Sequence, residues 1–203
     1  MTDGGETLGQ TPGATQAPGQ RRTYLLVDGE NIDATLGMSV LGHRPAPEER
    51  PRWDRIAEFA TRTWSQPVRS LFFLNASTGQ MPMSFVQALL AMSYHPIPLA
   101  GSATEKVVDI GIQRTLEALR DRPGDVLLAS HDGDFLPQLE ALLDGTRRVG
   151  VLCFREFVNA KITELSAAGL TLFDLEDDVA AFNTALPRVR IIPLEQFDPT
   201  RYL

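Results

Sequence analysis

Carboxylates that follow two apolar runs are the residues of this chain best placed to do chemistry. Asp28 directly follows the run at 24–27, and Asp132 and Asp134 come just after the run at 126–129. Because the carboxyl ends of central parallel strands face the crevice where ligands bind, we expect these acids to share one site. Two like charges in one turn repel each other unless a cation or strong hydrogen bonds offset the repulsion.

Each acid also has a structural interpretation when it is taken alone. Asp28 is placed to cap a following helix, and Asp109 falls in the first turn of an expected helix, where a negative charge suits the helix dipole. The combination is more informative, because that helix leads back to the strand before Asp132. Oxygen ligands alone favour Mg²⁺ or Mn²⁺, and the chain offers no Cys/His zinc set. Such a site would activate water against a phosphodiester.

The elements that must position these acids alternate regularly from residue 23 onward. Strands are predicted at 23–28, 68–74, 95–99, 126–129, 149–154 and 170–173, and helices at 53–64, 81–93, 105–120, 135–143 and 159–168. Residues 37–52 are predicted to form an irregular loop, and Gly145 is a candidate helix C-cap. The alternation predicts an α/β fold of three α/β/α layers around a mostly parallel sheet in the order 3-2-1-4-5.

Composition sets the domain limits and the class of protein. Residues 1–22 are poor in large apolar side chains and are predicted to be a disordered tail; the domain spans 23–178, and 179–203 form a C-terminal extension. Its run at 189–192 is interpreted as an added strand or a docking segment. No apolar run approaches the roughly 20 residues that cross a bilayer. We expect a cytoplasmic protein without membrane contact, in which the single Cys153 belongs to the core.

The net charge of −7 argues against a passive nucleic-acid coating protein, which normally carries a basic face. The negative charge does not argue against a nuclease, because a metal-binding cluster of acids itself makes the net charge more negative. A homodimer is compatible with the sequence, which does not reveal the oligomeric state.

Three blocks of the chain resemble the NYN domain, a branch of the PIN-like nucleases. The blocks are Leu26-Val27-Asp28-Gly29-Glu30-Asn31, Lys106-Val107-Val108-Asp109 and Ser130-His131-Asp132-Gly133-Asp134-Phe135. The resemblance covers roughly residues 23–178 and implies a PIN-like fold, a site dependent on Mg²⁺ or Mn²⁺, and usually RNA as substrate. By position, it implies that the metal-site acids are Asp28, Asp109, Asp132 and Asp134.

Polar residues beside these acids complete the expected site. Asn31 and Ser130 match the family's polar residues around the metal, and Lys106 is expected either to pair with the acids or to meet a substrate phosphate. His131 is expected to be a hydrogen-bonding partner more than a general acid. His43 and Arg44 lie in the loop predicted at 37–52, where either solvent or the entering RNA strand would contact them.

Some positions depart from the family's pattern. Val107 stands where the family commonly has glycine, His131 and Gly133 alter the third block, and Thr115 replaces a further acid.

The resemblance implies a metal-dependent ribonuclease, with a catalytically weak or inactive RNA-binding or regulatory NYN module as the alternative. A haloacid-type phosphatase is a third class, which usually needs a second aspartate where Glu30 stands. The sequence leaves the RNA substrate, endo- or exonucleolytic action and the number of metals open.

Overall fold

A six-stranded parallel sheet forms the centre of the computed structural model, which describes residues 21–203 except 103, 191, 193 and 202. The strand order is β3-β2-β1-β4-β5-β6. The strands are β1 (Thr23–Asp28), β2 (Val68–Asn75), β3 (Tyr94–Leu99), β4 (Asp125–Ala129), β5 (Val149–Cys153) and β6 (Thr171–Asp174). The predicted order is confirmed, with β6 added at the outer edge. The predicted tail, 1–22, lies outside the described residues except for its last two.

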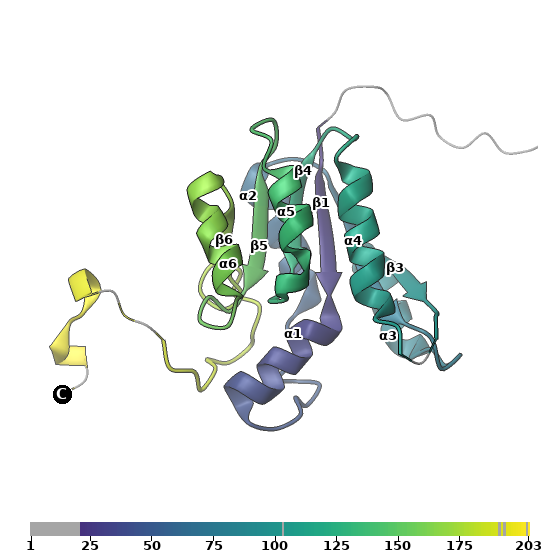
Figure 1. Cartoon of the computed structure of the whole chain (residues 1–203). Coiled ribbons are helices and arrows are strands. Elements are labelled where there is room, and N and C mark those ends of the chain that lie inside the picture. Colours follow the sequence, from purple (N-terminus) through teal and green to yellow (C-terminus); the bar gives the residue numbers. More distant parts are fainter. Residues whose placement is uncertain (1–20, 103, 191, 193, 202) are drawn as a thin grey trace, which may run out of the picture.

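Helices cover both faces of this sheet. They are α1 (Gly29–Thr35), the π-helix η1 (Leu36–Leu41), α2 (Trp53–Trp64), α3 (Met83–Ala91), α4 (Val107–Leu119), α5 (Leu136–Leu142) and α6 (Ala160–Glu164), with short 3₁₀ turns η2 (Gly133–Phe135), η3 (Leu165–Ala168), η4 (Leu194–Gln196) and η5 (Pro199–Arg201). In Figure 1, α4, α5 and α6 stand in front of the sheet and α2 lies behind it. The predicted three-layer α/β/α fold is therefore confirmed.

Alternate side chains of the central strands pack into two separate hydrophobic cores, one on each face of the sheet. Leu25 and Val27 of β1 pack with Ile56 of α2 on one face, while Leu26 of β1 packs with Ile112 of α4 on the other. Because both faces are covered, the central strands are apolar along nearly their whole length, as parallel strands usually are. Cys153 is buried in the second core, as predicted.

The first connection differs from the prediction. Residues 37–41, expected to begin an irregular loop, belong instead to the π-helix η1 that continues α1, and the loop starts only at Gly42, whose φ is +73°. The apolar residues of this stretch that are buried, Ile32, Leu36 and Val40, recur every four positions. Gly37, Met38 and Leu41 lie between and beside them, so the sequence shows no clear contrast between an apolar and a polar helix face.

Two smaller predictions were wrong. Helix α5 ends at Leu142, so Gly145, with φ of +76°, belongs to the turn after the helix and is not its C-cap. In the C-terminal extension, the described residues of the run at 189–192 form no strand, and Val189 is 91% exposed. The strand interpretation of that run fails because no sheet edge pairs with it.

The carboxyl edge of the sheet is where the candidate site forms. Strand β1 passes directly into α1, which projects beyond this edge in Figure 1. Gly29 permits the turn, because a Cβ atom there would lie 2.5 Å from the ring of Phe72. In the part of the chain described, no helix is both long and apolar enough to cross a membrane.

Candidate metal centre

Three of the four predicted acids meet beyond the end of β4. Asp109, Asp132 and Asp134 each offer a carboxylate oxygen, and these oxygens lie within 4.8 Å of one another. Asp109 comes from the first turn of α4, whereas Asp132 caps η2 and Asp134 lies within it. Mg²⁺ binds oxygen ligands at about 2.1 Å, so two of its ligand oxygens are at most about 4.2 Å apart, and small side-chain movements would bring these three oxygens around one ion. The donor set fits Mg²⁺ or Mn²⁺.

Asp28 lies beside this group but is not part of it. It is only 2% exposed, its Oδ1 accepts a hydrogen bond from Asn31 N at 3.1 Å, and its Oδ2 accepts one from Ser130 Oγ at 3.1 Å. Burial, with a smaller contribution from the nearby charges of Asp109 and Asp132, raises the pKa of Asp28 to about 6, although these hydrogen bonds act in the opposite direction. The four predicted acids therefore form a group of three, with a fourth, buried acid next to it.

Lys106 already neutralises part of the acid group. Its Nζ lies 3.1 Å from Asp134 Oδ2 and 3.4 Å from Asp109 Oδ2, and its side chain is 68% exposed. These ion pairs raise the pKa of Lys106. Because the ammonium group is solvated, the pairs hold it only weakly, and it can leave the carboxylates without breaking any packing.

Asn31 is held in place by His131. Asn31 Oδ1 accepts a hydrogen bond from His131 N at 2.8 Å and lies 3.1 Å from His131 Nδ1, while His131 Nε2 accepts one from Phe154 N at 2.8 Å. Because Nε2 accepts, the ring proton is on Nδ1, which donates to Asn31. Burial lowers the pKa of His131 to about 4, so the ring is neutral near pH 7. Among the described residues, Asn31 Nδ2 has no hydrogen-bond partner.

The departures from the family pattern have local structural explanations. Val107 is buried at the start of α4, and Thr115 Oγ1 donates to Gly111 O at 2.7 Å within that helix. A Cβ atom at Gly133 would lie 2.4 Å from Asn159 Nδ2, and Asn159 caps α6 through Lys161 N. A residue with a Cβ atom at position 133 would therefore collide with the asparagine that caps α6.

Sequence reasoning missed one polar residue of the site. Gln113 Nε2 donates to the backbone oxygen of Asp134 at 3.1 Å and so joins α4 to the turn that carries two of the acids. Gln113 follows Asp109 by four residues, which places both on one face of the helix. That spacing was the available signal.

Comparisons with known proteins bear on the family and the fold of the chain. The family model of the NYN domain, which belongs to the PIN-like superfamily, matches residues 22–172. A crystal structure of a protein of unknown function from Vibrio parahaemolyticus RIMD 2210633 has a similar fold, with a TM-score of 0.60 and 19% sequence identity over 81% of this chain and 98% of that one. No curated protein matches the chain significantly in sequence.

Proposed function

Because the chain belongs to the NYN domain family, we propose that it is a metal-dependent ribonuclease that hydrolyses phosphodiester bonds at its acidic centre. The observation that carries this proposal is the convergence of Asp109, from α4, with Asp132 and Asp134, from the turn after β4. Like charges gathered at this spacing are unfavourable without a cation, and phosphodiester hydrolysis is a reaction that such a centre supports.

Each polar residue has a defined part in this proposal. Asp109, Asp132 and Asp134 would hold Mg²⁺ or Mn²⁺, which when bound activates a water molecule and stabilises charge on the phosphate. Asp28 fixes the turn, because its Oδ2 accepts from Ser130 Oγ, which in turn accepts from Asp132 N at 3.2 Å.

Two further side chains are available to the substrate. The oriented amide of Asn31 offers its Nδ2 to a phosphate oxygen or a water molecule. Lys106, once released from Asp109 and Asp134, reaches from the same exposed position towards a phosphate. Both contacts would fix the scissile group relative to the acids.

The test is cleavage of mixed single-stranded and structured RNAs in Mn²⁺. We expect wild type to cleave and Asp134→Asn to lose more than about a hundredfold in rate, because a ligand oxygen and its charge are removed. Asp121→Asn is the matched control: Asp121 is exposed and follows α4 at the opposite edge of the sheet, so full activity is expected. Equal cleavage by wild type and Asp134→Asn would refute the proposal and indicate a contaminating nuclease.

One observation favours a second function. Lys106 pairs with two of the three carboxylates that a metal ion would use, as expected of a catalytically inactive RNA-binding or regulatory module. That function predicts RNA binding without any cleavage in Mn²⁺, and binding that is unchanged in Asp134→Asn. The same set of proteins therefore distinguishes the two functions.

A further inference from the structure

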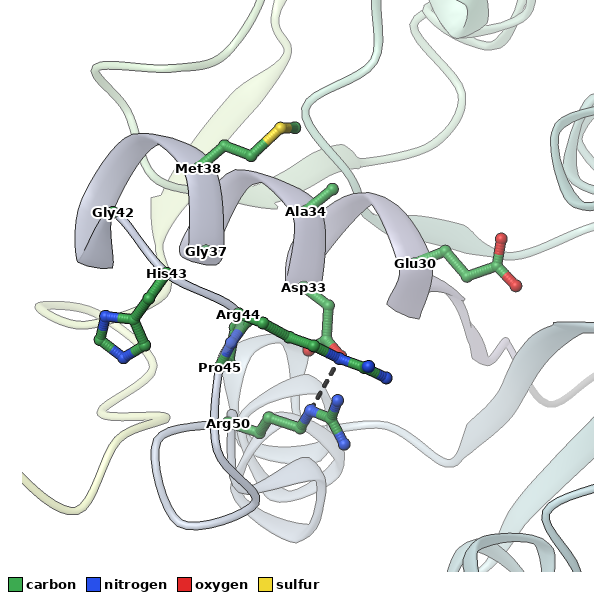
Figure 2. A pocket seen from close by; sticks show the side chains of 10 residues that line it. All are labelled: Glu30, Asp33, Ala34, Gly37, Met38, Gly42, His43, Arg44, Pro45 and Arg50. Atoms are coloured by element: carbon green, nitrogen blue, oxygen red, sulfur yellow. Dashed lines mark ion pairs between the residues drawn. The ribbon is translucent and has the colours of Figure 1, made fainter.

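A second polar cluster lies along α1 and η1, outside the acid group. It lines a pocket of about 700 Å³ between these helices and the loop that follows Gly42 (Figure 2). Ala34, Met38 and Pro45 contribute apolar surface, and Met38 is 80% exposed. Arginine side chains and two acids supply the polar part of the wall.

The charges in this pocket are unevenly paired. Arg50 Nε lies 2.9 Å from Asp33 Oδ2, so Arg50 has a carboxylate partner. Arg44 is exposed and makes no ion pair within 4 Å of a described residue, although its charge, like that of Arg50, acts on Asp33. Two guanidinium groups therefore share one carboxylate. Glu30 is the second acid of the wall, so two arginines and two acids balance in charge, but no ion pair joins Arg44 to either acid.

The pocket begins near the acidic centre in the sequence. One of its lining residues is Glu30, two residues after Asp28 in the chain. Asp33 is five residues after Asp28, about 8 Å along the helix axis at 1.5 Å per residue. In Figure 2 the guanidinium groups of Arg44 and Arg50 point towards the end of α1 that carries Glu30. A strand lying along α1 would therefore meet both the acids and the arginines.

We propose that this pocket binds a phosphate of the RNA strand next to the scissile one, with Arg44 as its main contact. The inference rests on the proposed function, because RNA is the substrate assumed there. The planar fork of a guanidinium group matches phosphate oxygens in pairs. Glu30 repels a phosphate, so the phosphate sits at the arginine end of the pocket. The apolar surface of Met38 and Pro45 suits a ribose or the face of a base.

RNA binding by Arg44→Gln tests the subsite. The affinity of a short fluorescein-labelled single-stranded RNA is measured by anisotropy in Ca²⁺ at several salt concentrations, with RNA integrity checked on a gel. We expect about tenfold weaker binding, because one charged hydrogen-bonded contact is lost. We also expect a salt dependence shallower by about 0.7 in slope, because one phosphate contact is lost. Arg44 makes no ion pair with a described residue, so the variant is expected to fold.

Arg122→Gln is the matched control, since Arg122 is exposed in the turn between α4 and β4, at the opposite edge of the sheet. It should change the affinity less than about twofold. The proposal is overturned if Arg44→Gln matches wild type, if both variants weaken binding equally, or if wild type binds no RNA. Binding is measured without cleavage, so an Arg44 effect in a protein that never cleaves RNA would refute only the nuclease proposal.

Discussion

The neutral ring of His131 decides how Asn31 faces the acidic centre. One ring nitrogen accepts from Phe154 N, so the other must donate to Asn31 Oδ1, which leaves the amide nitrogen for a ligand. The ring also stacks on Phe154, with centroids 5.4 Å apart. A glycine at this position could not make these contacts, so the orientation of Asn31 in this chain depends on His131.

We expect His131→Ala to lower the free energy of unfolding by about 2–4 kcal/mol, since it leaves Phe154 N unpaired and opens a cavity. Urea denaturation measures the change. His95→Ala, at an exposed position of β3, should stay within about 0.5 kcal/mol of wild type. If both variants were equally stable, the hydrogen bonds of His131 would not contribute as described.

At the residue scale, the sequence revealed which acids lie near the site. It did not reveal that three of them form the cation-binding group and that the fourth, Asp28, is buried beside it. Strand ends and one helix turn predicted Asp28, Asp109, Asp132 and Asp134 as neighbours, because parallel strands present their carboxyl ends on one edge. The burial of Asp28 depends on α1, which was not predicted. The contact of Gln113 with Asp134 depends on how α4 packs against the turn, which spacing along the chain does not determine.

The strands are held at their amino edge by a second buried acid, Asp125. This residue begins β4 and accepts hydrogen bonds from Arg21, Gln66 and Arg148, which precede β1, β2 and β5. One carboxylate thus fixes the starts of four neighbouring strands. Burial alone would raise the pKa of Asp125, but the hydrogen bonds from Arg21, Arg148 and Gln66 outweigh it and lower the pKa to about 2.

The pH dependence of stability follows from this lowered pKa. Asp125 binds its proton more weakly in the folded state than at its ordinary pKa of 3.8, so its contribution is complete above about pH 5 and is lost as the pH falls towards 2. We expect Asp125→Asn to be about 2 kcal/mol less stable than wild type at neutral pH. The difference in free energy of unfolding between wild type and Asp125→Asn, measured by urea titration, should become smaller below pH 4. A difference that does not change with pH would contradict the role of the charge.

At the element scale, strands were easier to predict than connections. Continuous apolar runs between turn residues mark buried strands, and all six lie where they were expected, within two residues. Strand β3 contains Pro96 and Pro98 and lies at the edge of the sheet, where a proline need not donate a hydrogen bond to a second neighbouring strand. The π-helix was missed because its apolar residues Leu36, Met38, Val40 and Leu41 do not follow one helical stripe in the sequence.

At the scale of the whole molecule, the C-terminal extension is packed against the domain. Val179 and Ala181 are buried in the first core, beyond the end of the family match at residue 172. Arg188 is 2% exposed and pairs with Asp174 at 2.5 Å and with Glu156 at 2.7 Å. Composition alone could not show this, because it does not reveal that Arg188 pairs with Asp174 and Glu156, which precede it by 14 and 32 residues.

We expect Arg188→Ala to lower the free energy of unfolding by about 3–5 kcal/mol, because Asp174 would remain buried without its cation. Thermal or urea unfolding measures the loss. Arg190→Ala is the control: Arg190 is 39% exposed and pairs with Glu176 and Asp177 at the surface, so a change below about 1 kcal/mol is expected. Equal effects of the two variants would show that the extension is not anchored through Arg188.

The central claim is that acids from distant segments form one cation site, and Mn²⁺ titration calorimetry tests it most directly. Wild type and the control Asp121→Asn should bind Mn²⁺ equally. Asp109→Asn should bind it more than about tenfold more weakly, because one carboxylate ligand is lost from the group of three. Unchanged Mn²⁺ binding in Asp109→Asn, or none in wild type, would contradict the claim.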